Sequence, residues 1–338
     1  MNFFQILSEI EKTDPEVFER FDSRRRVFKH MTGFGKKMTA AALPLAMGSI
    51  FNKAYGQTTT SAPSIPDVLN FALKLEYLEA YFYNLGLSGD GTIGNNTTSA
   101  TQTALRAQMS PNNVTALLKI RTDENNHVNF LREALTKAGA TPIAVPAVSQ
   151  FDFTGGKGSG TGPFAGVFTD AGLFLAVAQS LEDTGVRAYK GGAPYLASND
   201  DILTAALNIH SVEARHAARL RTMRRGGLMN TAPAGTAAGS NPSSSPKSWV
   251  SGTDNGGASP AQTAAIYGAG TAPAYTPSGI TFPAEDNVTQ GGVNLQTALA
   301  SLNFPASAFS EAFDEPLPVP TVLSIASTFT ITGSTFFA

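Results

Sequence analysis

The stretch Glu124-Asn125-Asn126-His127 is repeated in spacing by Glu213-Ala214-Arg215-His216. On a helix, residues three apart differ by only about 60° around the axis, so each Glu and its His project from one face. With 13 Glu among 338 residues, a given His has a Glu three positions before it about 4% of the time. Two such pairs among four His would arise by chance on the order of 1% of the time. Because its Glu and His lie on one face of the helix, each pair can reach one metal ion.

Two further segments each supply a carboxylate and a tyrosine. Glu76 is followed seven residues later by Tyr83, and Glu182 is followed at the same interval by Tyr189. Seven residues make nearly two helical turns, so each Tyr is expected above its Glu on the same face. The order Glu…Tyr and then Glu-x-x-His occurs twice along the chain, which predicts two related helical hairpins.

Hydrophobic spacing and capping residues predict four long helices, over residues 66–87, 110–137, 166–190 and 199–225. Ser110 and Pro111 are a cap followed by a first-turn proline, and Gly226 with Gly227 ends the last helix. A connection rich in Gly and Pro, from residue 140 to about residue 162, separates the second helix from the third. We therefore expect an all-α fold, a four-helix bundle with one long crossover connection.

The bundle would bring four carboxylates and two imidazoles into one core. Four buried carboxylates could not all stay ionised without cations, because a buried charge needs a partner. Two divalent ions would offset four negative charges, and mixed oxygen and nitrogen ligands suit iron or manganese. The chain has no cysteine, which excludes disulfides, zinc–thiolate sites and iron–sulfur clusters. The pattern predicts a metal site, and the alternative is four amphipathic helices whose carboxylates face water.

The region from about residue 66 to residue 225 resembles the ferritin-like superfamily. The matching segments are residues 75–83, 124–127, 181–189, 212–217 and 312–317. With its leader, the chain is similar to a bacterial exported branch related to plant desiccation-associated ferritin-like proteins. The long crossover and C-terminal extension differ from compact cage-forming ferritins, so storage of iron in a shell is not expected. The resemblance implies a centre of two iron ions, alternatively two manganese or mixed iron and manganese, at Glu76, Glu124, His127, Glu182, Glu213 and His216.

For the residues beside these six, the sequence allows more than one role. Tyr83 and Tyr189 could be redox-active or donate hydrogen bonds to ligands, and plain core packing explains them equally well. Glu79 is expected at the edge of the site. His210 could support a ligand from outside, but a core or surface histidine is the simpler interpretation. The remaining charged neighbours are expected to face solvent or to pair with one another: Asp123, Asp183, Arg215 and Arg219.

The first 56 residues are expected to be a leader segment, with a helix-like stretch over residues 3–20. Seven basic residues lie between positions 20 and 37, and an uncharged stretch follows from residue 38 to residue 52. That stretch is shorter than the ~20 residues that span hydrocarbon, which favours an export signal. Residues 23–29 (SRRRVFK) look like a twin-arginine signal, which directs export of folded proteins in bacteria. The alternative is a basic segment lying on anionic lipid, and cleavage of the leader is left open.

Composition sets limits on the partners and on the rest of the chain. Charged residues make up 15% and the net charge is −2, which argues against a general nucleic-acid binder. Residues 229–338 are rich in small neutral residues but contain two short apolar pieces that could dock on the bundle. The expected organisation is a leader over residues 1–56, a bundle over residues 64–228, and a loop-rich extension over residues 229–338 that packs on the bundle.

These expectations lead to one main functional hypothesis and two alternatives. The main hypothesis is an exported dimetal oxidoreductase that acts on O2 or peroxide, with ferrous oxidation as one half-reaction. It would be periplasmic or in the cell envelope, tethered to the membrane if the leader is retained, and a homo-oligomer is compatible with it. The first alternative is a stress or desiccation-type structural protein in which the metals only stabilise the bundle. The second is peroxide dismutation in the manner of manganese catalases.

Overall fold

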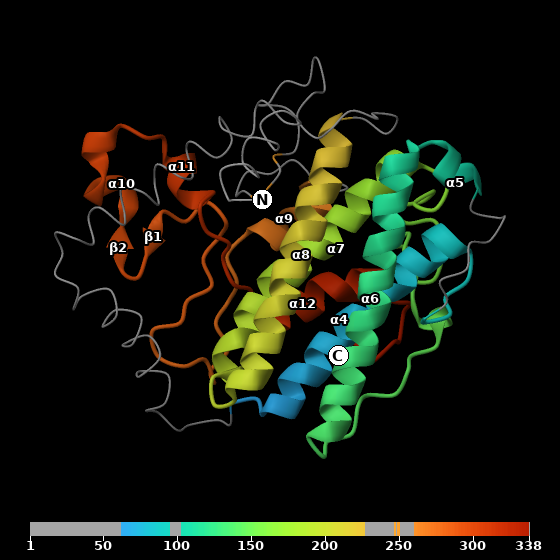
Figure 1. Ribbon diagram of the computed structural model, residues 1–338, viewed down its shortest axis with the longest axis horizontal. Helices are drawn as coiled ribbons and strands as arrows, with labels where there is room; N and C mark the ends of the chain where they lie inside the picture. Colours follow the sequence, from blue (N-terminus) through green and yellow to red (C-terminus); the bar gives the residue numbers. More distant parts are fainter. Residues whose placement is uncertain (1–61, 95–102, 227–246, 248, 251–259, 338) are drawn as a thin grey trace, which may run out of the picture.

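The computed structural model describes residues 62–94, 103–226, 247, 249–250 and 260–337. Four long helices form its centre (Figure 1): α4 (Ile65–Ser88), α6 (Pro111–Lys137), α7 (Ala171–Gly192) and α8 (Asp200–Gly226). This arrangement confirms the expected all-α bundle. The leader over residues 1–56 lies outside the described residues. Within the described part of the chain, no helix is both long enough and apolar enough to cross a membrane.

The four helices pair as two hairpins. α4 packs mainly against α6, and α7 packs mainly against α8, while contacts of α4 with α7 and of α6 with α8 close the bundle. Tyr83 meets Glu182 and Tyr189 meets Glu76, so α4 and α7 run antiparallel. The connection between α6 and α7 is the expected crossover, and it lies along α4, where Tyr81 donates a hydrogen bond of 2.6 Å to the Pro146 carbonyl.

Capping side chains set the helix ends close to the predicted positions. Ser64 and Asp67 form a capping box at the start of α4, and Ser110 caps α6 just before Pro111. The prediction for the third helix was wrong at its start. α7 begins at Ala171 because the Asp170 carboxylate accepts a 2.8 Å hydrogen bond from the Leu173 N–H, whereas the preceding residues form turns.

Shorter elements complete the described structure. β1 and β2 are an antiparallel pair in which Thr289 lies opposite Asn294. The shorter elements are α5 (Thr103–Ala107), η2 (Val148–Gln150), η3 (Ala193–Leu196), α9 (Pro260–Tyr267), β1 (Thr289–Gln290), β2 (Val293–Asn294), α10 (Leu295–Ala298), η4 (Ala300–Leu302), α11 (Ala306–Ser310), α12 (Val319–Ala326) and η5 (Ser327–Phe329).

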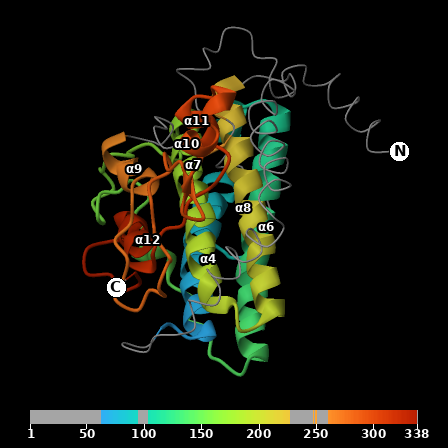
Figure 2. The same ribbon diagram turned by 90° about the vertical axis from the view of Figure 1, so that its left-hand side faces the viewer.

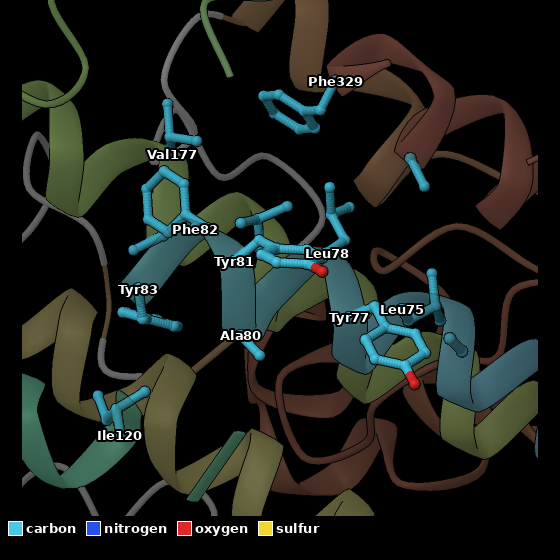
Figure 3. Close-up of a cluster of buried hydrophobic side chains, with 14 of the residues drawn as sticks. Leu75, Tyr77, Leu78, Ala80, Tyr81, Phe82, Tyr83, Ile120, Val177 and Phe329 are labelled. Carbon is cyan, nitrogen blue, oxygen red and sulfur yellow. The ribbon is translucent and has the colours of Figure 1, made fainter. Parts of the chain in front are cut away.

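Aromatic side chains join the bundle to the crossover and to the C-terminal region. Phe82 of α4 stacks on Phe174 of α7, with ring centroids 4.7 Å apart. Its ring also meets Phe153 of the crossover edge to face at 5.4 Å, and Phe153 in turn packs against Phe329. Figure 3 shows Phe82 and Phe329 within this buried cluster. Burying each such ring contributes about 1.5–3 kcal/mol, so the crossover and the C-terminal region share one core with the bundle.

The C-terminal region covers one side of the bundle. α12 packs against α7 and α4, and α9 packs against α7. Figure 2 shows α9 and α12 on the α7 side, while α6 and α8 lie on the other side. The approach is close at Gly191, where an added Cβ would overlap the Leu317 carbonyl oxygen. Helix α7 is therefore buried nearly all round, whereas α6 and α8 each keep a face toward solvent.

Candidate metal centre

Each of the four bundle helices contributes acidic or imidazole side chains to a single buried cluster. α4 supplies Glu76 and α7 supplies Glu182, one carboxylate each. α6 and α8 each supply the Glu and the His of one Glu-x-x-His motif. The carboxylates of Glu76, Glu124, Glu182 and Glu213 are all 0% exposed, and both imidazoles are buried as well. The structure therefore brings together all six residues that the sequence analysis singled out.

Both imidazoles turn the same ring nitrogen, Nδ1, toward the acids. His127 Nδ1 lies 3.2 Å from a Glu76 oxygen, 3.1 Å from a Glu124 oxygen and 3.4 Å from a Glu213 oxygen. His216 Nδ1 lies 2.8 Å from Glu124 and 3.2 Å from Glu182. Each imidazole thus faces carboxylates from more than one helix, an arrangement that neither helix could make alone.

The side chains divide into two overlapping groups, and within each group one ligand atom from every member lies within 4.8 Å of the others. Glu124 and Glu213 belong to both groups, so they would be the ligands common to both ions if each group held one. The first group is Glu76, Glu124, His127 and Glu213, and the second is Glu124, Glu182, Glu213 and His216.

Each predicted tyrosine lies at the cluster, but its partner is the acid of the opposite helix. Tyr83 of α4 donates a 2.5 Å hydrogen bond to Glu182 of α7, and Tyr189 of α7 donates one to Glu76 of α4. Seven residues place a Tyr about 10 Å along the helix from its own Glu, which is too far for a direct bond. The antiparallel neighbour presents its Glu at the level of the Tyr instead. The two hydroxyls therefore bind acids reciprocally across the α4–α7 contact.

Comparison with known families agrees with this geometry. Residues 65–225 match a family model described as a ferritin-like domain. This region is a ferritin-like domain. Searches of curated proteins and of solved structures found no match. The relation to an exported bacterial branch and to desiccation-associated proteins stays a prediction.

Burial dominates the electrostatics of the ferritin-like domain's core. Loss of solvent raises the pKa of Glu76 to about 7, and it raises the pKa of Glu213 well above the usual range, with the Glu124 charge adding to the effect. Glu182 also has a raised pKa for the same reason. Glu124 differs, because His127 and His216 outweigh the burial of its carboxylate and lower its pKa. Without metal ions, the acids with raised pKa values therefore stay protonated at pH values where a free carboxyl group is ionised, which reduces the repulsion among them.

Two observations in the ferritin-like domain test whether the cluster fits a pair of metal ions. Both carboxylate oxygens of Glu213 are buried and lack a hydrogen-bond donor among the described residues, although His127 lies nearby. Gly185 of α7 leaves open the space beside them, since an added Cβ would lie 2.5 Å from a Glu213 oxygen. An acid with free lone pairs, next to space that a side chain would fill, suits a cation. The donor set of carboxylate oxygens and imidazole nitrogens fits iron or manganese.

Glu79 lies deeper than the edge position expected from the sequence. Its side chain is buried, and burial together with the nearby Glu213 charge raises its pKa well above the usual range. Glu79 and Gly185 both line a cavity of about 30 Å³ that lies between the bundle and the C-terminal region. This volume can hold a water molecule. The cavity therefore brings a solvent-sized space to the carboxylates from the side that the C-terminal region covers.

Asp123 is a further residue at the site, and the sequence analysis did not assign it this role. Its carboxylate lies 3.3 Å from His216 Nε2 on the neighbouring helix. A carboxylate on the outer ring nitrogen fixes the tautomer and the direction of a ligating imidazole. The contact joins α6 to α8, and no spacing within either helix could reveal it.

The other charged neighbours lie away from the cluster. Asp183 pairs with an arginine as expected, but the partner is the buried Arg221, not Arg215 or Arg219. Burial lowers the pKa of His210, and the charges that act on it are those of Asp314 and Lys190. His210 therefore belongs to the surroundings of the C-terminal region and not to the cluster.

Proposed function

We propose that the protein is a dimetal oxidoreductase that holds two iron or manganese ions and reduces O2 or peroxide. In this proposal Fe(II) oxidation is one half-reaction that the centre could support. The ligands would be the six buried side chains, with Glu124 and Glu213 shared between the ions. When bound, such a pair of ions supplies electrons to O2 or peroxide and an open coordination position for the oxidant.

The single observation that carries the proposal is the excess of buried acids over imidazoles in the cluster, which centres on two acids common to both ligand groups. Glu124 and Glu213 belong to both ligand groups, and among the described residues the Glu213 oxygens have no hydrogen-bond donor closer than His127 Nδ1 at 3.4 Å. Removing a carboxylate from water costs several kcal/mol unless a cation or donors replace the water. Two imidazoles cannot balance the four ligand acids and Glu79, so a further cation is the simplest partner.

The chain's own groups prepare the site in three ways. The Tyr83 and Tyr189 hydroxyls hold one oxygen each of Glu182 and Glu76, which leaves the second oxygen of each acid directed toward an imidazole. Asp123 keeps His216 Nδ1 directed into the cluster. Burial excludes bulk water and strengthens every charge interaction among these groups.

Metal content and turnover of the purified full-length chain test the proposal. The metal-free protein would be reloaded with Fe(II) or Mn(II), and bound metal would be measured by elemental analysis. Consumption of O2 or H2O2 would then be followed for the native chain, for a Glu124→Gln/Glu213→Gln variant and for a Glu133→Gln control. Glu133 is an exposed acid on α6, with a side chain 63% exposed and paired to Lys137.

We expect two ions per chain and turnover in the native protein and in the control, and loss of both in the double variant. Unchanged metal content in the double variant would contradict the ligand assignment. Evolution of O2 from peroxide without a reductant would indicate dismutation instead.

A structural role for the same centre is the second candidate, and the way α7 is covered favours it. α7 is packed against the bundle on one side and against α9 and α12 on the other, so ions at Glu182 would stabilise both layers. Bound metal without turnover, together with a lower melting temperature in the double variant, would support this stress or desiccation-type role.

We also propose export by the twin-arginine route, with the protein in the periplasm or cell envelope. Support comes from the basic leader sequence and from the benefit of loading a metal centre before translocation. Replacing Arg24, Arg25 and Arg26 by Lys keeps the charge but removes the arginines. Retention of this variant inside cells that export the native chain would support twin-arginine recognition, whereas equal export would favour attraction by basic charge alone.

A further inference from the structure

A second cavity lies within the bundle, about one helical turn from the carboxylate cluster. It has a volume of about 290 Å³, and residues of α4, α6, α7 and α8 line it together with η3. Its position follows from the ligands along each helix. Ala72 precedes Glu76 by four residues, Leu131 follows His127 by four, and Ile209 precedes Glu213 by four. Four residues make about one turn, so the cavity occupies the next layer of the bundle.

Tyr189 is the partition between the cavity and the cluster. Its ring lines the cavity, while its hydroxyl donates a hydrogen bond to Glu76. A molecule in the cavity would therefore contact Tyr189, whose hydroxyl is hydrogen-bonded to Glu76, a proposed metal ligand. Such a molecule would lie beside the proposed metal centre while staying outside the cluster of carboxylates.

The lining is apolar apart from two residues. Tyr189 uses its hydroxyl on Glu76, and Asp201 lies exposed near the N-terminus of α8. The side chains deeper inside are buried aliphatic groups such as Leu69, Leu131 and Ala206, while Phe130 is 44% exposed. The exposed positions place the mouth beside Phe130 and Asp201. A charged ligand would lose its hydration inside and gain no partner there.

The volume limits the size of the occupant. An engineered apolar cavity of about 150 Å³ stays dry and binds benzene. The 290 Å³ of this cavity, which opens to solvent beside Phe130, is nearly twice that volume, but it is too small for a helix of a partner protein. It suits a molecule of about ten carbon atoms, such as two fused rings or a branched hydrocarbon.

We infer that this cavity is a binding site for a small, uncharged, apolar organic molecule held against Tyr189. The inference deepens the proposed function by naming the class of organic molecule that the centre would meet, and only that link rests on the proposed function. Binding itself depends on the cavity and not on the metals.

Naphthalene is the probe, and titration calorimetry on the full-length chain is the measurement. We expect saturable binding of one naphthalene per chain in both the metal-free and the Mn(II)-loaded protein. 2-Naphthalenesulfonate, of nearly the same shape but charged, should bind at least tenfold more weakly. Equal binding of the two compounds would overturn the apolar class.

Two variants that fill the cavity from different helices localise the site. Ala72→Leu on α4 and Ala206→Leu on α8 should each weaken naphthalene binding at least tenfold. Filling an empty apolar space commonly stabilises a protein, so both variants are expected to fold. Ala218→Leu is the matched control, because this half-buried alanine lies on α8 beyond the cavity, and binding should stay within twofold. Absence of saturable binding, or tight binding by both folded filling variants, overturns the inference.

Two further measurements do not depend on the variants. Crystals soaked with 1-bromonaphthalene should show the anomalous bromine signal inside the cavity, and a signal elsewhere would overturn the inference. In Co(II)-loaded protein, saturation with naphthalene should shift the metal's visible absorption through Tyr189 and Glu76. If naphthalene binds but no metal does, the proposed function fails while the binding site stands. If metal binds with a spectrum that naphthalene leaves unchanged, the link to the centre fails.

Discussion

Two of the buried charged clusters on α7 differ in how their charges are balanced. Arg187 is 0% exposed and directs its guanidinium to Glu285, 2.9 Å away, and to backbone carbonyls of the C-terminal region that include Gly268, Pro283 and Glu315. The metal-centre cluster has more acids than imidazoles, and in the described part of the chain the only donor near Glu213 is the His127 imidazole, at 3.4 Å. The first cluster is complete in charge, since Arg187 faces Glu285, although Glu285 Oε2 has no hydrogen-bond partner among the described residues. The second is incomplete, and in the proposed function ions from outside would balance its acids. The same helix therefore carries one cluster that holds the C-terminal region on the bundle and one that we propose binds ions.

The largest effect is expected from removing the arginine of the complete cluster. Arg187→Met would remove the ion-pair partner of the buried Glu285 carboxylate, which keeps its hydrogen bond from the Glu315 N–H, and would leave several carbonyls without their donor. Breaking a buried pair by removing one partner costs about 3–5 kcal/mol. Urea denaturation would measure the loss in the free energy of unfolding. Arg215→Met, at an exposed arginine on α8, is the control and should change stability by less than about 0.5 kcal/mol. Equal stability of the two variants would show that Arg187 does not hold the C-terminal region on the bundle.

The pH dependence of stability should separate the metal-free from the metal-loaded protein. Burial raises the pKa of Glu76 to about 7, so between pH 4.5 and 7 the folded metal-free chain keeps a proton that the unfolded chain has lost. The pKa of His127 and of His216 is also raised by the neighbouring acids, which extends the same trend above pH 6.5. The free energy of unfolding of the metal-free protein therefore falls as pH rises, by about 3 kcal/mol from Glu76.

Bound ions should reverse this trend, because protons compete with metals for the same oxygens and nitrogens. Melting temperatures at pH 5, 6, 7 and 8 for metal-free and Mn(II)-loaded protein are the measurement. The pKa of Glu285 is raised to about 8 by burial and acts in both forms, so the difference between the forms isolates the metal centre. A metal-free protein that gains stability from pH 5 to pH 7 would contradict the assigned shifts.

Removing one acid of the incomplete cluster should have an effect opposite in sign to that of Arg187→Met. Glu213→Gln keeps the shape and is neutral without taking up a proton, so near neutral pH the metal-free protein should gain about 1–3 kcal/mol. The same variant should lose the additional stability that Mn(II) gives the native chain, because a shared ligand is gone. Glu133→Gln is again the exposed control. Destabilisation of the metal-free Glu213→Gln protein would show that the acid is satisfied without metal.

The sequence predicted which six side chains meet in the bundle core better than it predicted their surroundings. Glu124 and His127 share a helical face because of their spacing alone, and amphipathic packing turns that face inward. The crossed bonds of Tyr83 and Tyr189 depend on the antiparallel register of α4 and α7, which no local pattern contains. The partners of Arg187 are mostly backbone carbonyls. Every residue has such a carbonyl, so no residue type in the sequence indicates which ones Arg187 contacts. The apolar cavity is lined by residues of four helices and η3 together, so the sequence pattern of any one helix does not indicate it.

The smallest change in stability, but a clear change in metal affinity, is expected from Asp123→Asn. The Asp123 carboxylate lies 3.3 Å from His216 Nε2 and also pairs with Lys119, whose side chain is 68% exposed. An exposed pair contributes about 0–1 kcal/mol, so the metal-free protein should melt almost unchanged. Loss of the carboxylate would free the imidazole to turn its Nδ1 away from Glu124 and Glu182. Changes to a ligand's outer partner typically weaken metal binding about 10- to 100-fold, which chelator competition with Mn(II) would measure.

Lys119→Met separates the two contacts of Asp123, because it removes the exposed pair and leaves His216 in place. We expect the affinity of this variant for Mn(II) to stay within about twofold of the native value. If Asp123→Asn and Lys119→Met weaken binding equally, Asp123 acts through surface charge and not through the direction of His216. If neither weakens binding, the α6–α8 contact does not support the metal centre. If only Asp123→Asn weakens Mn(II) binding, Asp123 supports the metal centre through His216. The incomplete cluster then includes a residue on the solvent-facing side of the bundle.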